Sequence, residues 1–344
     1  MSPLRWSAAD IAAALGRPTP TDEQVAVIEA PLEPLLVVAG AGSGKTETMA
    51  ARVVWLIANE RVSPDAVLGL TFTRKAAGEL SERVRARLAA LRRRGVGAES
   101  SVFLAPTVST YHAYAGALVA DHALRLGIEP ASRLLGEAGR WQLAHEVVEH
   151  WAEDLDTDLT PGWITAQVLK LADGLAEHLH GPQAVVEHGE RLAAALAAVP
   201  PGGRKGDADK VARVLATARL RSRLAPVVAA LGARKRAADL MDFADQVALA
   251  ARVAREVPEV GAGERSRFRV VLLDEYQDTS VAQLDLLTHL FGSGGGGAVL
   301  PGAGHPVTAV GDPHQSIYGW RGARARGLFR VPAGVPPRGG RAAG

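Results

Sequence analysis

Short apolar runs and amphipathic helical stretches alternate along two parts of the chain. The first part extends from Gln24 to about Tyr114, and the second begins near Met241. The runs Leu35–Val38 and Val270–Leu273 are apolar, with valines and leucines only, as expected for strands buried on both faces of a parallel sheet. This alternation predicts an α/β domain built on a parallel sheet.

The middle of the chain has a different pattern. Residues from about 116 to 236 show alanine- and leucine-rich helical spacing without strand-like runs, interrupted at 200–203 by two prolines and two glycines. We therefore expect a mostly helical subdomain inserted into the sheet domain. The expected parts are a discontinuous domain at 1–115 and 237–323, the insertion, and a disordered Gly/Pro/Arg tail at 324–344.

A helix is predicted to begin near Arg74, because apolar residues recur at intervals of three and four along it. These residues are Ala77, Leu80, Val84, Leu88 and Leu91. Arginines occupy its other positions, among them Arg83, Arg85 and Arg87. Two readings stay open for these arginines, a patch that attracts nucleic acid and an ordinary solvated face.

Composition narrows the class of protein. The chain has 344 residues, enough for about two domains. No apolar stretch reaches the ~18 uncharged residues of a membrane span, and the absence of cysteine excludes disulfides and thiolate metal sites. We expect a cytoplasmic, nucleoid-associated protein with no membrane partner.

The net charge of +2 does not describe a basic domain. Residues 321–344 hold six arginines and no acid, which leaves a net charge of −4 for residues 1–320. Any affinity for nucleic acid must therefore come from local patches such as Arg74 and Lys75.

A glycine-rich loop follows the first predicted strand and precedes a helical stretch. It comprises Ala39, Gly40, Ala41, Gly42, Ser43, Gly44, Lys45 and Thr46. Glycines let backbone N–H groups turn inward around a phosphate, a lysine here reaches the β- and γ-phosphates, and a threonine ligates Mg²⁺. The strand before and the helix after argue against a plain turn, so the loop predicts binding of ATP with Mg²⁺.

A pair of acids, Asp274 and Glu275, ends the predicted strand Val270–Leu273. Ligands of open α/β sheets bind at the carboxyl ends of the strands. Asp274 is therefore a candidate to hold Mg²⁺, and Glu275 a candidate to orient the water that attacks the γ-phosphate. A helix-capping pair of acids is the alternative.

Three longer segments give the chain a family resemblance. They are Asp274–Thr279 (DEYQDT), Gly311–Ala323 (GDPHQSIYGWRGA) and Thr71–Ala77 (TFTRKAA). Together with the phosphate loop they resemble the N-terminal portion of UvrD/Rep-type superfamily 1 DNA helicases, in the family's order from Gln24 to Ala323. The stretch after Lys45 is similar to actinobacterial members. The resemblance implies a RecA-like P-loop NTPase domain that carries an inserted helical subdomain.

The resemblance also implies roles for single residues. Gln24 matches a glutamine that reads the adenine edge, and Gln315 and Arg321 match groups that sense the γ-phosphate. The positions that match contacts to single-stranded DNA are Phe72, His112, Tyr318 and Trp320, and Arg74 is a further candidate contact because of its charge. An aromatic face can stack on a base without reading its sequence.

One position departs from the commoner pattern of the family. Many relatives carry an arginine near the adenine directly after the phosphate-loop threonine, whereas this chain has Glu47. Adenine stacking at this position is therefore not expected. Arg52 is close in sequence, but the sequence gives no ground for moving the role to it.

The resemblance implies ATP-driven 3′-to-5′ translocation on single-stranded DNA and at single/double-strand junctions. The resemblance implies a second RecA-like domain that supplies an arginine finger, and the family pattern is not continued after Ala323. The sequence therefore predicts a truncated product. We expect poor turnover from it, since an arginine finger is worth about 10³–10⁵ in rate. Three readings stay open: a helicase family enzyme, a module that binds ATP and single strands without useful turnover, and a nonfunctional gene fragment.

Overall fold

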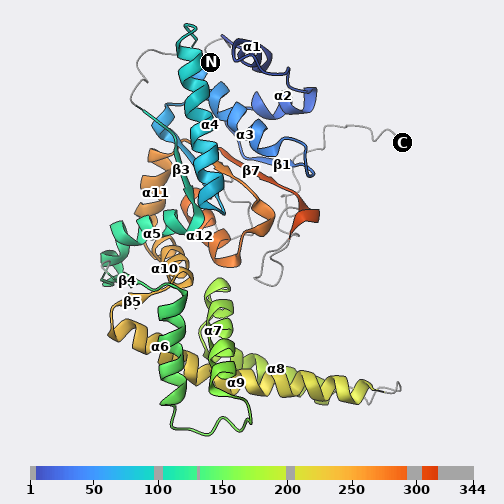
Figure 1. Ribbon diagram of the computed structural model, residues 1–344, viewed down its shortest axis with the longest axis vertical. Helices are drawn as coiled ribbons and strands as arrows, with labels where there is room; N and C mark the ends of the chain where they lie inside the picture. The colour runs from blue at the N-terminus through green and yellow to red at the C-terminus, as the bar shows by residue number, and fades with distance from the viewer. Residues whose placement is uncertain (1–4, 97–103, 130–131, 199–205, 293–303, 317–344) are drawn as a thin grey trace. The chain divides into compact units, whose positions relative to one another are not determined.

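The structure, a computed structural model, describes residues 5–96, 104–129, 132–198, 206–292 and 304–316 (Figure 1). The chain divides into two compact units. The first comprises Met1–Ala117 and Ala251–Gly344, and the second is Leu118–Ala250. The sequence predicts domain boundaries after residues 115 and 236. The second unit of the structure begins close to the first of these boundaries, at Leu118, but ends later than the second, at Ala250.

A five-stranded parallel sheet forms the centre of the first unit. Its strands are β1 (Leu35–Val38), β2 (Val67–Thr71), β3 (Thr107–Thr110), β6 (Val270–Leu273) and β7 (Val307–Gly311), in the spatial order β1-β7-β6-β2-β3. All four pairings are parallel. The expected α/β domain with a parallel sheet is confirmed, and β7 lies one residue later than the predicted strand at 306–310.

Helices cover this sheet. Within the first unit they are α1 (Ala8–Ala14), α2 (Asp22–Ile28), α3 (Lys45–Ala58), α4 (Arg74–Arg92), α11 (Pro258–Arg267) and α12 (Val281–Phe291), with short 3-10 turns η1 (Pro64–Ala66), η4 (Tyr276–Asp278) and η5 (Pro313–Gln315). Two more helices, α5 (Tyr111–His122) and α10 (Phe243–Glu256), each begin in one unit and end in the other.

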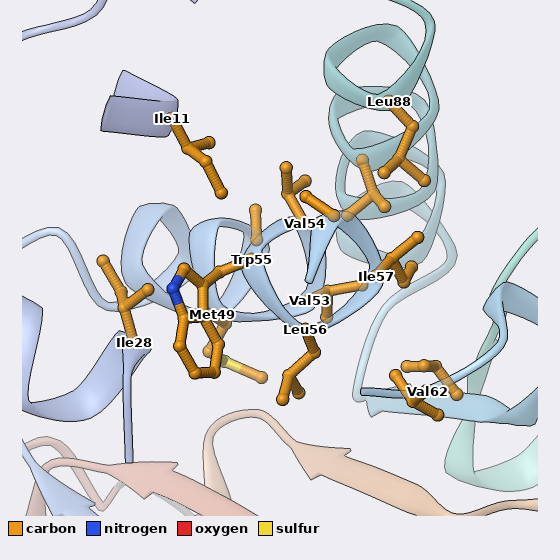
Figure 2. Packing of buried hydrophobic residues seen from close by; sticks show 14 of the residues in the cluster. Ile11, Ile28, Met49, Val53, Val54, Trp55, Leu56, Ile57, Val62 and Leu88 are labelled. Atoms are coloured by element: carbon orange, nitrogen blue, oxygen red, sulfur yellow. The ribbon is translucent and has the colours of Figure 1, made fainter. Parts of the chain in front are cut away.

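Helix α3 runs through the main hydrophobic core of this unit. In Figure 2, Met49 and Leu56 point below α3 as it is drawn, and Leu88 of α4 lies above the right-hand end of α3. Val270 and Leu272 of β6 belong to the same core, and the alternate residues Val271 and Leu273 are buried as well. Burial of both strand faces is why the sequence of β6 is continuously apolar.

Helix α4 has the predicted apolar stripe, because Ala77, Leu80, Val84, Leu88 and Leu91 are all buried. The sequence left open whether the arginines of α4 form a solvated face or a patch that attracts nucleic acid. Neither interpretation fits Arg87. Arg87 is buried and points to α3, whereas Arg85 lies on the exposed side.

The second unit is mostly helical. Its elements are η3 (Ala123–Leu126), β4 (Arg133–Leu134), α6 (Glu137–Glu149), α7 (Pro161–Glu177), α8 (Gln183–Ala197), α9 (Asp207–Ala237) and β5 (Leu240–Met241). Helices α6, α7 and α9 share a core that includes Ala144, Val168 and Val227. The sequence shows no strand-like run at 116–236, yet β4 lies there and pairs in parallel with β5 over two residues. So short a strand gives no hydrophobic period to read.

The second unit contains a buried cluster of charged side chains next to β5. Lys235 donates to Asp242 at 3.1 Å and to Asp245 at 2.5 Å. The Nε atom of Arg140 lies 3.0 Å from the same Asp242, which is 4% exposed. Among the described residues, no helix is both long enough and apolar enough to cross a membrane.

Candidate functional site

The glycine-rich loop joins β1 to α3. Gly42 and Gly44 have φ values of 75° and 82°, a left-handed conformation that side-chain-bearing residues rarely adopt. Lys45 is the first residue of α3 and Thr46 the second, so both lie at the positive end of the helix dipole. Gly40, Ala41, Gly42 and Ser43 are exposed, as a loop that wraps around a phosphate requires.

The ammonium group of Lys45 lies between two other candidate residues. Its Nζ donates to Oε1 of Gln315 at 3.2 Å and lies 3.8 Å from Oε2 of Glu275. The Lys45 side chain is only 11% exposed. Three predicted residues from α3, η5 and the end of β6 therefore meet at one point.

Asp274 is a buried carboxylate at the end of β6, 5% exposed. Burial, and next the charge of Glu275, raise the pKa of Asp274 to about 6, although the N–H of Glu275 donates to its Oδ1 at 3.0 Å. A carboxylate that is desolvated beside a second acid is stabilised by a bound cation. Asp274 therefore fits the predicted Mg²⁺ ligand.

The described residues contain no group of three or more histidine, aspartate or glutamate side chains that could hold a metal ion. Mg²⁺ in phosphate-transfer sites is usually bound by one or two protein ligands, with water and phosphate oxygens completing the octahedron. Asp274 and Thr46 would supply two such oxygens beside the phosphate loop.

Glu275 adopts a left-handed backbone conformation, with φ of 50°, which is costly for a residue with a side chain. Its side chain is held by Gln277, whose Nε2 donates to Oε2 of Glu275 at 2.8 Å. The Oε1 of Gln277 accepts the N–H of Asp312 at 2.9 Å. Gln277 thus joins the end of β6 to the end of β7. No role for Gln277 follows from the sequence, although it lies inside the segment Asp274–Thr279.

Gln24 lies against the phosphate loop. Its Nε2 donates to the carbonyl of Ser43 at 3.3 Å, and its Oε1 accepts the N–H of Thr21 at 3.1 Å. A carboxamide has two N–H donors and an oxygen with two lone pairs. One donor and one lone pair therefore remain for the edge of a base. A Cβ at Gly44 would be only 3.2 Å from Nε2 of Gln24.

Glu47 lies in a cluster of arginines. Nη2 of Arg87 contacts both its carboxylate oxygens, at 2.5 and 2.6 Å, and Arg17 and Arg83 lie 3.7 and 3.8 Å away. Glu47 is thus occupied as an ion-pair partner. The cavity beside it lies among α1, α2 and α3, and Arg17, Gln24 and Arg87 also contribute to its wall.

Arg52 does not take over a role beside the base. Its side chain is wholly buried, and its guanidinium donates to backbone carbonyls and to Thr308. Arg52 is therefore not available to contact an adenine base in place of residue 47.

The candidate DNA contacts follow two neighbouring strands. Phe72 comes directly after β2 and His112 soon after β3, and Thr71 and Thr110 are partners in the parallel register. Both side chains are partly exposed, and Arg74 is exposed at the first turn of α4. Phe72 packs against the buried ring of Tyr111, with ring centroids 4.9 Å apart. The Tyr111 ring therefore helps to hold Phe72 in place, a contact that the sequence does not indicate.

Three further candidates, Tyr318, Trp320 and Arg321, lie outside the described residues. The glycine-rich stretch at 293–303 lies outside them as well.

The strand order separates the two groups of candidates. The phosphate loop follows β1, Gln315 follows β7 and the acids follow β6, whereas Phe72 and His112 follow β2 and β3. Because all five strands are parallel, every one of these residues lies at the carboxyl edge of the sheet. Strand β6, at the middle of the sheet, lies between the half of the edge that carries the glycine-rich loop and the half that carries Phe72 and His112.

Comparison with known proteins agrees with this geometry. Residues 20–333 match the UvrD/REP helicase N-terminal domain. The chain is 30% identical over 322 residues to the ATP-dependent DNA helicase UvrD1 of Mycobacterium tuberculosis, covering 90% of this chain and 34% of that protein. It is 27% identical over 315 residues to the ATP-dependent DNA helicase PcrA of Staphylococcus aureus, covering 91% of this chain and 36% of that protein. The chain thus spans about a third of the length of these relatives.

Proposed function

The chain belongs to the UvrD/REP helicase N-terminal domain family, and from this membership we propose that it is the ATP-binding half of a DNA helicase motor. In this proposal it binds ATP with Mg²⁺ at the phosphate loop and single-stranded DNA at the ends of β2 and β3. The convergence of Lys45, Glu275 and Gln315 within 3.8 Å is the observation that carries the proposal.

Each residue at the phosphate side has a distinct role in this proposal. Lys45 binds the β- and γ-phosphates, and its present partner Gln315 exchanges that contact for one to the γ-phosphate. Thr46 and Asp274 hold Mg²⁺, which supplies charge neutralisation for phosphoryl transfer. Glu275 orients the attacking water, and Gln277 keeps its carboxylate in place. Arg321 is proposed to act on the γ-phosphate beside Gln315.

The aromatic side of the edge is proposed to hold single-stranded DNA. A base stacked on Phe72 would gain about 1–3 kcal/mol without any reading of sequence. Arg74 is placed to bind a backbone phosphate, with His112 beside it and Tyr318 and Trp320 as further stacking groups. In a motor that contains this domain, the two halves of the edge would couple ATP turnover to movement along the strand in the 3′-to-5′ direction and into single/double-strand junctions.

The experiment is ATP hydrolysis by the purified chain with and without an oligothymidine strand, beside Lys45→Ala and Glu275→Gln. We expect slow hydrolysis that the strand stimulates and that both substitutions abolish. ATP binding should be lost in Lys45→Ala and kept in Glu275→Gln, because only the first removes a phosphate ligand.

Two results would count against parts of the proposal. Hydrolysis that persists unchanged in Glu275→Gln would remove that residue from the chemistry. ATP binding without hydrolysis under either condition would leave a nucleotide-binding module and overturn the enzymatic part for this chain.

A further inference from the structure

Arg52 is a buried cation without a carboxylate partner among its described contacts. It lies on α3, two turns after Lys45, and its side chain is wholly enclosed. Burial lowers the pKa of Arg52 to about 10, so the guanidinium remains protonated at neutral pH. Enclosing a charge is costly unless polar groups compensate it. The groups that accept its hydrogen bonds show which parts of the fold Arg52 joins.

Four backbone carbonyls surround the guanidinium. Nη1 donates to Val27 at 2.9 Å, to Ile28 at 3.3 Å and to Ala30 at 2.8 Å, and Nη2 donates to Pro31 at 3.0 Å. These carbonyls belong to the C-terminal end of α2 and the residues that follow it. Carbonyls at a helix C-terminus have no partner within the helix and carry partial negative charge. Arg52 therefore caps α2 from a neighbouring helix.

The same guanidinium also reaches the sheet. Its Nε donates to Oγ1 of Thr308 in β7 at 3.1 Å, and Thr308 is 1% exposed. One side chain thus joins α2, α3 and β7. Helix α2 carries Gln24, and α3 begins with Lys45 and Thr46. Strand β7 leads into the turn η5, which contains Gln315.

Helix α2 is short, and Gln24 is near its start. Seven residues extend over about 10 Å, so fixing the C-terminal carbonyls of α2 also fixes the position of Gln24. One hydrogen bond depends on this position: Nε2 of Gln24 donates to the Ser43 carbonyl of the phosphate loop at 3.3 Å, so a small shift of α2 would break it.

We infer that Arg52 is a positioning residue for base recognition: by capping α2 from α3 it holds Gln24 against the phosphate loop, so that selectivity for adenine depends on it. The inference rests on the proposed nucleotide site and extends it to a residue that touches no ligand. A residue with only a structural role would affect every ligand of the folded protein alike. Arg52 should affect only the ligands that carry a base.

The test compares the affinity of the full chain for three probes, each with Mg²⁺: ATP, GTP and inorganic tripolyphosphate. In Arg52→Met we expect ATP to bind on the order of tenfold more weakly, the equivalent of one lost hydrogen-bonding arrangement. Tripolyphosphate affinity should stay within about twofold, and the preference for ATP over GTP should shrink. Arg52→Lys keeps the charge and fewer of the hydrogen bonds, and should fall between.

Arg265→Met is the matched control. Arg265 also donates to a carbonyl at a helix end, that of Leu290 in α12, but it lies in α11 and holds no part of the phosphate loop. Its substitution should lower stability and leave the ratio of ATP to tripolyphosphate affinity unchanged. Gln24→Ala should reproduce the Arg52→Met pattern, and the double variant should be no weaker than Gln24→Ala alone.

The outcomes separate this inference from the proposed function. Equal weakening of ATP and tripolyphosphate in Arg52→Lys, or no change in either, would overturn the role of Arg52 while leaving the nucleotide site intact. If Lys45→Ala binds ATP as well as the unaltered chain does, the nucleotide site itself is wrong. Should Arg52→Met not fold, Arg52→Lys carries the comparison alone.

Discussion

Glu47 and Arg52 lie five residues apart on α3 and meet opposite environments. Glu47 is at the surface of the helix, where three arginines approach it, and Arg52 is enclosed by backbone carbonyls. The sequence showed that Glu47 departs from the commoner arginine, but it could not show which groups would surround either side chain. The role of each of these charged side chains therefore depends on the groups that distant segments of the chain bring next to it.

The Glu47–Arg87 contact should be measurable as stability. Arg87 is 6% exposed and Glu47 42%, so Glu47→Gln would leave a buried guanidinium without its counter-charge. We expect a loss of about 1–2 kcal/mol, below the about 3–5 kcal/mol of a fully buried pair because Glu47 is partly hydrated. Urea denaturation measures this. Glu79→Gln, which breaks an exposed pair with Lys75, should cost less than about 0.5 kcal/mol; equal losses in the two variants would contradict the assignment.

His305 should give the fold a dependence on mild acid. Burial, helped by the charges of Arg265 and Arg269, lowers the pKa of His305 from 6.5, against the opposing effect of its hydrogen bond to the Phe268 carbonyl. The unfolded chain therefore binds this proton at a higher pH than the folded chain does. Its contribution to stability is complete above about pH 6.5 and is lost as the pH falls through the lowered pKa.

The measurement is the urea midpoint of the unaltered chain and of His305→Gln between pH 8 and pH 5. The difference between the two should change in that range, with the unaltered chain losing more stability on acidification. Parallel pH profiles would show that His305 does not titrate differently in the folded state.

At the scale of the element, the end of β7 depends on one small residue. A Cβ at Gly311 would lie 2.5 Å from Oε1 of Gln277 and 3.2 Å from its backbone nitrogen. Gln277 in turn holds the carboxylate of Glu275. Close packing of two strand ends therefore supports the candidate catalytic acid.

Gly311→Ala should displace Gln277 and strain both strand ends. We expect a destabilisation of about 1–3 kcal/mol, with hydrolysis reduced more than ATP binding because Glu275 loses its support. Gly78→Ala is the control, since a Cβ added there would meet nothing within 4 Å apart from its chain neighbours and the adjacent backbone of α4; it should stabilise the fold by about 0.5–1 kcal/mol. Denaturation and hydrolysis measured on both variants check this, and a neutral Gly311→Ala would remove the proposed strain.

The elements were predictable where the hydrophobic period was long or the chemistry local. The strand before the phosphate loop, the strand before the paired acids and the apolar stripe of α4 all follow from residues that are adjacent in sequence. The pairing of β4 with β5 was not predictable, because two-residue strands have no period. The contacts of Gln277, Tyr111 and Arg87 were missed because each joins segments far apart in the chain.

In the molecule as a whole, a single parallel sheet brings together residues from Lys45 to Gln315. The strand order β1-β7-β6-β2-β3 places the glycine-rich loop, Gln315 and the paired acids beside one another, and Phe72 and His112 beside one another, at the same edge. Sequence order alone does not give this separation, because β7 is inserted between β1 and β6. We propose that this edge is an ATP site whose affinity depends on Lys45.

The most direct test is calorimetric titration of the unaltered chain and of Lys45→Ala with ATP in the presence of Mg²⁺. We predict one bound ATP per chain, and no measurable binding in Lys45→Ala, with both proteins unfolding cooperatively at similar urea concentrations. Absence of binding to the cooperatively folded unaltered chain, or equal affinity in the two proteins, would show that this edge is not an ATP site that depends on Lys45.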